Sequence, residues 1–478
     1  MSAVAERARR ASIRVVLAAL AAALGPLLPA ESAAQDEAPE AAAAPGPWRP
    51  DAAYFGGDIK QFFFMTFPYD HPLMPEDPSG QAIFDVRLKG SVKQGGWRAE
   101  LHPVLTTIAP GALSAGGFVQ TGVGVPEAVE LSAELVDASG LFMRARVDRA
   151  NLSFKTTHVA VTLGRQPVSF GRGAFFTPLD LVNPFQPTVI DSSYKPGVDA
   201  ARVDLYAGES GQVILVAAYS GGWDRQGSVL AAWGQRTVGG WDLALFAASA
   251  HADLVGGLSA NGGIGPIGLR AEGSVTRPDP DGAAPALDAL RVQLGGEPLG
   301  AARDPTVRAL IGADWRPGPR TTLSGEAYVQ TLGAADPNDY FIQSSDPRYA
   351  RGELWLAGRV YGALAVQQEL RPTLHSGLSL ISNLLDPSAL AGANLSWSVA
   401  NNAELLVGGY AGLGERPGQP PPLSPTLAAQ LDQGQALGLL TQADVAAAQG
   451  AWDLIHTPVN SEFGNTPAIV FTQLRTYF

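Results

Sequence analysis

Charged side chains recur at every second position in several segments of about ten residues, the length of a tilted strand that crosses a bilayer. The same alternation appears in the segments 141–148, 267–276, 321–330 and 353–366. The clearest case is the segment 82–92, in which one side carries Asp85, Arg87, Lys89 and Ser91 and the other carries Ala82, Phe84, Val86, Leu88 and Val92. Because successive side chains of a strand point to opposite faces, each segment predicts one charged face and one apolar face.

The charged faces together offer ten positive and eight negative side chains that could line a water-filled lumen. The positive ones are Arg87, Lys89, Arg98, Arg144, Arg146, Arg202, Arg270, Arg308, Arg359 and Arg475, and the negative ones are Asp85, Glu100, Asp148, Asp204, Glu272, Asp314, Glu326 and Glu353. A charged and hydrated wall suits a diffusion channel, although the same groups could pair between neighbouring strands and stiffen the wall. We expect Glu326 to lie on the hydrated wall, and Leu323 and Leu356 to face lipid.

Residues that could form a catalytic or metal site are not grouped along the chain. No Gly-x-Ser-x-Gly elbow or phosphate loop is present, and the absence of cysteine excludes thiol-based metal sites. The six histidines fall singly, without paired metal-ligand spacing, at His71, His102, His158, His251, His375 and His456. We therefore expect no enzyme, no cofactor and no metal, and a barrel enzyme is the least favoured alternative.

The first residues have the pattern of a secretory signal peptide. A basic head that ends at Arg14 precedes the apolar run 15–30, and small residues follow up to Ala34. We predict Sec-type export with cleavage near Ala34, so that 1–34 is the signal peptide. The segment 35–52, rich in Ala, Pro and Glu, should be a flexible lead-in. The net charge of -12 makes nucleic acid an unfavourable partner.

The connections between the predicted strands alternate between short and mostly longer ones, as in outer-membrane barrels. The short ones are 93–96, 156–157, 208–211, 238–239, 316–319 and 401–402, and the longer ones include 68–80, 109–140, 171–196, 333–350 and 413–467. We therefore predict an all-β, up-and-down antiparallel transmembrane barrel over 53–478, with long extracellular loops and both termini in the periplasm. Its strand count is about 18, which requires a strand near 290–294, and the alternative count is about 16.

The last segment supports the same fold. Its residues alternate up to the C-terminal aromatic Phe478, and such an ending resembles the signal by which outer-membrane barrels are recognised for assembly. The expected partners are therefore the lipid of the outer membrane, the barrel-assembly machinery and small solutes or ions. The sequence leaves open the oligomeric state, the solute and the pore radius.

The longest predicted loop, 413–466, carries signals for short helices. Ser424 followed by Pro425 is typical of a helix start, and the segment from Thr441 to Asp444 resembles a capping box. This insert should form a helical pair outside or within the mouth of the barrel. A plugged or gated barrel with an export, structural or adhesive role is therefore the alternative to an open channel.

One stretch of the chain combines glycine, arginine, proline and aromatic residues in a recognisable order. It comprises Leu163-Gly164-Arg165-Gln166, Phe170-Gly171-Arg172-Gly173, Phe176, Pro178, Asp180, Asn183-Pro184-Phe185 and Gly197-Val198-Asp199-Ala200. This stretch resembles a family of poorly characterised, porin-like outer-membrane proteins of proteobacteria. It covers about forty residues, and Phe170 stands where Trp is common in that family. The resemblance implies a barrel that acts as a pore and allows the passive diffusion of small hydrophilic solutes or ions.

Within this stretch, three prolines between Gly171 and Pro196 forbid a central strand, so the segment should be a structured extracellular loop. Such a loop could fold into the pore and narrow it. Arg165, Arg172 and Asp180 are then candidates for the constriction. The alternative is that these charges only anchor the loop through salt bridges.

Overall fold

A computed structural model describes residues 50–72, 74–109, 124–138, 140–186, 188–190, 193–279, 305–343 and 347–478 of the chain. The predicted signal peptide and nearly all of the predicted lead-in lie outside the described residues and stay predictions. In the described part, no helix is both long enough and apolar enough to span a membrane.

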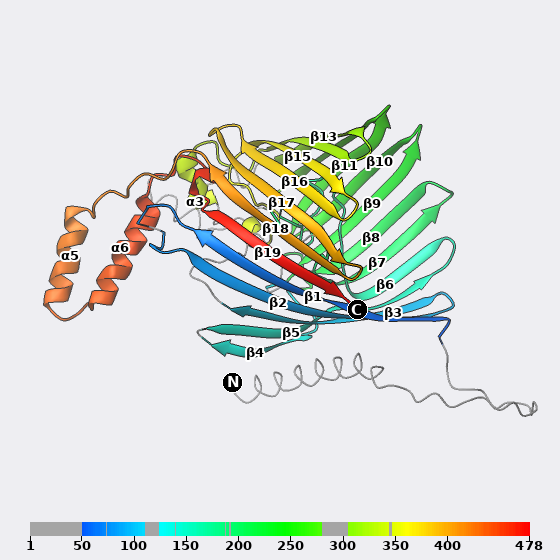
Figure 1. Cartoon of the computed structure of the whole chain (residues 1–478), viewed down its shortest axis with the longest axis horizontal. Helices are drawn as coiled ribbons and strands as arrows, with labels where there is room; N and C mark the ends of the chain where they lie inside the picture. The colour runs from blue at the N-terminus through cyan, green and yellow to red at the C-terminus, as the bar shows by residue number, and fades with distance from the viewer. Residues whose placement is uncertain are drawn as a thin grey trace, which may run out of the picture.

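The described residues form one closed antiparallel barrel (Figure 1). The strands are β1 Ala52–Phe67, β2 Ser79–Gln94, β3 Trp97–Ala109, β4 Ser132–Ala138, β5 Leu141–Lys155, β6 Val159–Gln166, β7 Val198–Ala207, β8 Gly211–Tyr219, β9 Ser228–Val238, β10 Trp241–Ala250, β11 Asp253–Ile264, β12 Ile267–Arg277, β13 Thr306–Gly318, β14 Thr321–Gln330, β15 Val360–Arg371, β16 Leu374–Asn383, β17 Ser388–Ala400, β18 Ala403–Leu413 and β19 Ala468–Tyr477. Apart from β4, each strand pairs with the strands on either side of it in the wall, and β1 pairs with both β2 and β19.

The wall itself has 18 strands, as the sequence predicted. β3 pairs directly with β5, so β4 is not one of the strands that form the wall. Instead, β4 pairs with the part of β5 from Leu141 to Arg146, beyond the reach of β6, whose pairing with β5 starts at Ala150. Every ladder, including the one that closes the barrel, is antiparallel, so the wall leaves no open edge to lipid.

One detail of the predicted strand assignment is wrong, and another lies outside the described residues. The latter is the strand predicted near 290–294; of the described strands on either side of it, β12 pairs with β13. The alternating segment 353–366 is only partly a strand, because β15 begins at Val360. Glu353, Leu356 and Arg359 therefore belong to the preceding loop.

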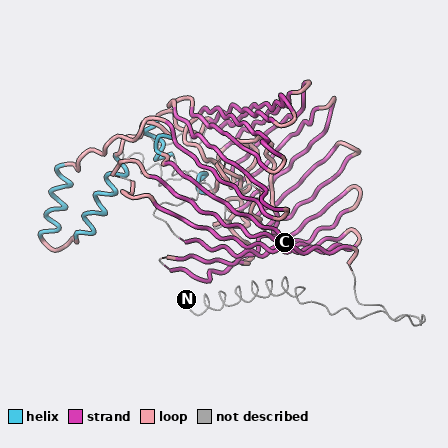
Figure 2. Tube along the Cα trace, viewed as in Figure 1, coloured by secondary structure: helices cyan, strands magenta, loops and turns pink. Residues whose placement is uncertain are grey.

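Tight turns join the strands at one end of the barrel (Figure 2). The first residues of β1 and the last residues of β19 lie at the same end. We call it the short-turn end. One of its turns is Gly239-Gly240, where both residues have a positive φ, which glycine adopts without strain. The opposite end, the long-loop end, carries most of the longer connections. Short helices also occur there, at α3 Tyr340–Gln343 and α4 Pro347–Ala350, with 3-10 turns at Pro337–Asp339 and Phe463–Asn465.

Two longer helices, α5 Pro425–Ala436 and α6 Gln442–His456, extend beyond the long-loop end at the left of Figure 1. Both begin at the capping residues that the sequence analysis singled out. The side chain of Ser424 accepts from the N–H of Leu427, and Thr441 and Asp444 form a complete capping box. The helical pair therefore lies outside the barrel rather than within its mouth.

The outward face of the wall is apolar. Large side chains on this face are among the most exposed of the described residues, for example Leu245 at 72%, Ile311 at 67% and Leu364 at 61%. Exposed aromatic side chains gather near the short-turn end, at Trp97, Phe154, Trp315 and Trp397. An apolar band with an aromatic girdle is the outer surface of a transmembrane barrel.

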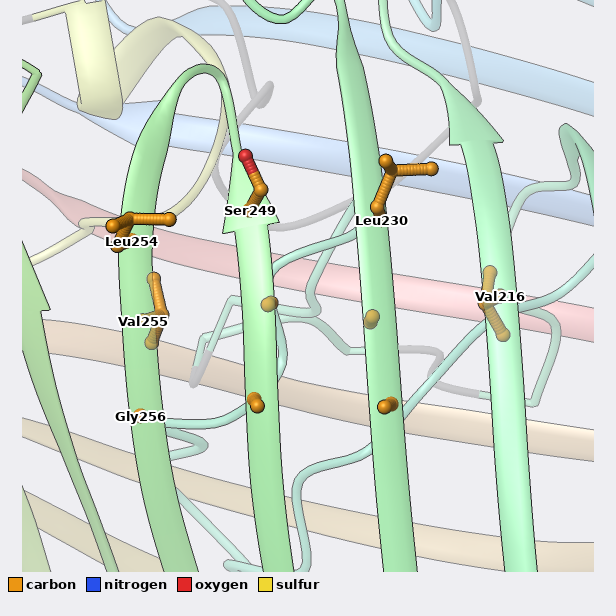
Figure 3. A pocket seen from close by; sticks show the side chains of 10 residues that line it. Val216, Leu230, Ser249, Leu254, Val255 and Gly256 are labelled. Atoms are coloured by element: carbon orange, nitrogen blue, oxygen red, sulfur yellow. The ribbon is translucent and has the colours of Figure 1, made fainter.

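A hollow of 530 Å³ interrupts this surface between β8 and β11 (Figure 3). Leu230 and Leu254 flank it, and small residues such as Ala247, Ser249 and Gly256 make room for it. Leu230 and Leu254 are more than half exposed, so the hollow opens on the outer face. It belongs to the apolar surface and not to the lumen.

Replacing Leu364 by Arg should lower the yield of folded barrel in lipid bilayers. The change places a cation in hydrocarbon, which costs about 2 to 4 kcal/mol near the midplane. The matched control is Ala365→Arg, because Ala365 is the next residue of β15 and faces the lumen. Equal folded yields for the two variants, measured by heat-modifiable migration on a gel, would contradict the assignment of faces.

Deleting Phe478 should reduce the amount of assembled barrel more than it alters conductance. The backbone of Phe478 both donates to and accepts from Gly57 of β1, at 3.1 and 2.9 Å, so the last residue extends the closing ladder. Its ring covers Gly57 so closely that a Cβ there would lie 2.4 Å from the ring. Immunoblots of outer-membrane fractions measure the effect; wild-type levels would show that Phe478 is an ordinary terminal residue.

Candidate functional site

The connection between β6 and β7, residues 167–197, lies inside the barrel, and we call it the lumen loop. The ring of Phe170 lies 5.1 Å from that of Phe246 on β10, and the ring of Phe176 stacks on Tyr328 of β14 at 4.7 Å. Further along the loop, Tyr194 reaches the opposite wall, where its ring contacts cations of β1 and β2. The lumen loop therefore crosses the interior of the barrel.

Two wall carboxylates hold the backbone of the lumen loop. Glu272 of β12 accepts from the N–H groups of Arg172 and Leu179, both at 2.8 Å. Glu326 of β14 accepts from the N–H groups of Ala174, Phe175 and Phe176 at 2.6, 2.9 and 3.1 Å. Hydrogen bonds to a charged acceptor are about twice as strong as neutral ones. Five amides that would otherwise be unpaired inside the barrel are thus satisfied by two side chains.

The prediction that Glu326 lies on a hydrated wall is wrong. Its side chain is fully buried, because the lumen loop covers it. The guanidinium of Arg270 lies 2.5 Å from one carboxylate oxygen of Glu326 and also pairs with Asp314. Arg270 and Glu326 therefore serve first as an anchor, and only the outer partner, Asp314, stays more than a third exposed.

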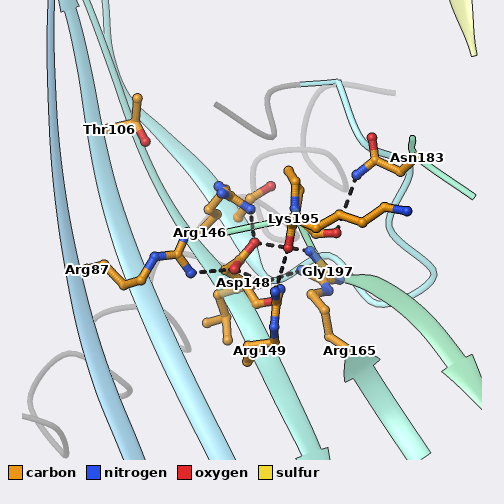
Figure 4. Close-up of polar contacts among 12 residues, drawn as sticks. Arg87, Thr106, Arg146, Asp148, Arg149, Arg165, Asn183, Lys195 and Gly197 are labelled. Atoms are coloured by element: carbon orange, nitrogen blue, oxygen red, sulfur yellow. Dashed lines mark hydrogen bonds and ion pairs between the residues drawn. The ribbon is translucent and has the colours of Figure 1, made fainter. Parts of the chain in front are cut away.

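A second anchor is centred on Asp148 of β5 (Figure 4). Its carboxylate receives Arg146 at 2.7 Å, Arg149 at 2.8 Å and Arg87 of β2, and it also accepts from the N–H of Gly197 at 3.1 Å. Arg149 in turn donates to the carbonyl of Lys195. The end of the lumen loop is thus fastened to the wall, and Arg87, Arg146 and Asp148 are buried structural charges.

A β-bulge brings the two neighbouring residues Asp148 and Arg149 to this anchor. The register of β3 and β5 shifts between His102 and Pro103, which pair with Arg149 and Val147. Pro103 has no N–H to donate, so a bulge in the partner strand at this point leaves no broken bond. The extra residue, Asp148, is then free to point at Gly197.

Two of the three constriction candidates are also anchors. Arg165 is 3% exposed and donates to Asp199, Glu127 and two backbone carbonyls. Asp180 is paired with Lys195 at 2.7 and 2.8 Å and is likewise buried. The geometry therefore favours the alternative in which these charges anchor the loop through salt bridges, for both Arg165 and Asp180.

Arg172 has a different environment from the other two candidates. Its side chain is exposed, lies 5.2 Å from the ring of Trp233 and donates to Gln235 of β9. The backbone beside it is fixed by Glu272, whereas the guanidinium points into the lumen toward the short-turn end. Arg172 is therefore the constriction candidate that a passing solute can meet.

The remaining candidates pair with each other, with loop residues or with neighbouring wall residues. Arg98 pairs with Glu100 and Arg202 with Asp204, both at 2.7 Å, and Arg144 pairs at 3.2 Å with Glu127 of the connection before β4. Contacts with loops are made by Arg308 to the carbonyl of Glu353, Arg359 to the carbonyl of Gly333 and Arg475 to Ser193. Asp85 accepts from Thr106, and Lys89 pairs with Asp58 at 2.5 Å. Pairing between groups, rather than a row of single charges, is the rule.

Asp58, Lys60 and Tyr194 are among the site residues that were not found from the sequence. Asp58 and Lys60 of β1 point into the lumen, and the ring of Tyr194 lies 5.7 Å from Lys60 and 4.5 Å from Lys89. The alternation in β1 was masked because the next inward residues, Phe62 and Phe64, are apolar. The position of Tyr194 depends on the path of the lumen loop, for which the sequence has no local signal.

A separate carboxylate ties the other loops together at the long-loop end. Glu462 accepts from the N–H of Ala357 at 2.7 Å, the hydroxyl of Tyr361 at 2.5 Å and the amide of Asn383 at 2.8 Å. Burial raises the pKa of Glu462 to about 7. Tyr361 also belongs to a hydrophobic cluster that buries Leu356, so the prediction that Leu356 faces lipid is wrong.

Comparison with known proteins shows the fold alone. No family model and no curated protein matches the sequence. Among solved structures, *Acinetobacter baumannii* OccAB1 is 9% identical, with a TM-score of 0.50 over 90% of this chain and 97% of that one. OccAB4 of the same species is 7% identical, with a TM-score of 0.50 over 90% and 99%. Both are outer-membrane porin structures, so the chain has the porin barrel fold.

Replacing Glu326 by Ala should release the lumen loop without opening the wall. The change leaves Arg270 and three amides without their buried acceptor, and removing one partner of a buried pair costs about 3 to 5 kcal/mol. We expect proteases added to the purified barrel to cut the lumen loop, while the strands stay resistant. Thr322→Ala, on the same face of β14 but nearer the short-turn end, is the control. Resistance of the loop in both variants would show that Glu326 is not its anchor.

Proposed function

We propose that this chain is an outer-membrane channel for the passive diffusion of small hydrophilic solutes or ions. The observation that carries the proposal is the opposition of the two faces of a closed wall. Leu245 and Ile311 point outward and are exposed. Arg172, Gln367 and Asn394 lie on the lumen side and are exposed as well. An apolar exterior suits lipid, and a polar interior suits water and polar solutes.

The proposal includes an orientation and a route of biogenesis. The long-loop end, with α5 and α6, faces the outside of the cell, and the short-turn end faces the periplasm. The chain reaches the periplasm by Sec-type export, loses residues 1–34 near Ala34, and is inserted by the barrel-assembly machinery through a terminal strand that ends at Phe478. The aromatic girdle at the short-turn end marks one boundary of the membrane. The direction follows from the loop lengths, because outer-membrane barrels have short periplasmic turns and long extracellular loops.

In this channel, the lumen loop is the constriction element. Glu272 and Glu326 fix its backbone, and Arg172 presents a cation to the solute between Trp233 and Gln235. The paired charges elsewhere on the wall hold the lumen open and hydrated. Because the positive and negative charges of the wall are nearly equal in number, the wall gives no strong preference for anions or cations. Arg172 therefore has a large share in ion selectivity.

A plugged barrel with an export, structural or adhesive role is the second candidate. It is favoured by the apolar clusters inside the wall, where Phe176, Leu356 and Phe463 pack together from three different connections. A plug of this kind would keep the purified protein from conducting.

The purified protein should conduct in planar bilayers, and Arg172→Glu should shift its reversal potential under a salt gradient toward that of a cation-selective pore. A carboxylate at the constriction repels anions and attracts cations. Arg236→Glu is the matched control, because Arg236 follows Gln235 on β9 but lies on its outer face. An absence of conductance would favour the plugged barrel, and equal shifts in both variants would remove Arg172 from the solute path.

A further inference from the structure

A second hollow, of 490 Å³, lies near the short-turn end of β13 to β17. The inward residues that line it include Thr322, Gln367, His375, Gly377, Asn394 and Ser396. In the register of the sheet, Thr322 pairs with Gln367, Gln367 with Gly377, and Gly377 with Asn394. These four residues therefore form one row across four neighbouring strands, on the face that lines the lumen.

Gly377 lines this hollow next to the amide of Asn394. A Cβ at this position would lie 2.9 Å from both amide atoms of Asn394, so any larger residue would displace that amide and narrow the hollow. Gln367 and Asn394 stand on either side of the glycine, on the two neighbouring strands. The result is a recess in the lumen wall with an amide group on each side.

The polar groups of the recess are available to a ligand. Gln367, His375 and Asn394 are exposed, and their side chains make no hydrogen bond to any other residue in the described part of the chain. This contrasts with the anchors of the lumen loop, where the carboxylates and guanidinium groups have partners. Each amide can donate two hydrogen bonds and accept two, and a neutral imidazole can donate one and accept one.

The charges near the recess lie at its edge, on the end of β13, on the turn that joins it to β14 and on β15. Arg320 of the turn lies 3.8 Å from Glu369 of β15, and Arg316 interacts electrostatically with Asp314. The row of Thr322, Gln367, Gly377 and Asn394 itself carries only neutral groups. These groups match a ligand that presents hydroxyl groups, each both donor and acceptor.

We propose that the recess formed by Gln367, Gly377 and Asn394 is a binding subsite for neutral polyhydroxylated solutes, such as a small sugar, on their way through the lumen. The inference rests on the proposed channel function and names a solute class for it. The subsite would distinguish a solute that makes several hydrogen bonds from an equally large solute that makes none. The second solute leaves the amides of Gln367 and Asn394 without partners.

The test uses the purified full-length barrel in planar bilayers, with sucrose as the probe. Sucrose should reduce the ion current in a saturable way, whereas a polyethylene glycol of similar hydrodynamic size, which donates only at its ends, should reduce it without saturation. Asn394→Leu keeps the volume of the side chain and removes its amide. It should weaken the apparent affinity for sucrose about tenfold.

Two further variants separate the recess from the width of the lumen. Gly377→Leu fills the recess and should abolish saturation by sucrose. Ala365→Leu adds similar bulk one row toward the long-loop end, outside the residues that line the recess, and should leave the affinity for sucrose unchanged. Equal effects of these two variants would mean that sucrose responds only to width, which overturns the subsite.

A second readout keeps the subsite and the channel distinguishable. Saturation-transfer NMR of sucrose with the protein in detergent detects binding without any current, and Asn394→Leu should remove the signal. A conducting protein that shows no sucrose signal overturns the subsite alone. A protein that binds sucrose through Asn394 but does not conduct supports the subsite and overturns the proposed channel.

Discussion

Buried carboxylates that need partners determine what lies inside this barrel. Glu272 and Glu326 project from the wall into a space where water does not reach them, and an unpaired buried charge is strongly destabilising. The backbone N–H groups of the lumen loop supply the partners, and the two carboxylates are the acceptors of those groups. Each side satisfies the other, so the loop is a fixed part of the lumen and not a flexible flap.

The wall is shaped to receive the loop. Where the loop packs against β7 to β10, small side chains such as Ala200, Ala218, Ala231 and Ala244 point inward, and the large ones, Phe170 and Leu179, come from the loop itself. Toward the short-turn end of β13 to β17, the residues that line the hollow come from the strands and their short turn, and its inward side chains are mostly polar. The interior thus has a packed part that fixes the loop and a hydrated part that is open to solutes.

The wall could be predicted from the sequence and the interior could not, for a physical reason. Alternation in segments such as 82–92 reflects the two solvents on the two faces, and the caps at Ser424 and Thr441 are local, so both are visible along the chain. Glu326 looked like any inward carboxylate, because its burial depends on a loop that begins far away in sequence. Leu356 was misplaced since a loop segment happened to alternate. Only the register and the path of the lumen loop distinguish an anchor from a hydrated charge.

The claim that the anchored lumen loop sets the width of the pore is tested most directly by polymer exclusion. Wild-type protein and the double variant Glu272→Ala, Glu326→Ala are compared in bilayers with neutral polyethylene glycols of graded size, and the largest polymer that enters each pore is determined. The account predicts that the double variant admits distinctly larger polymers and conducts more. The same size limit in both proteins would contradict it.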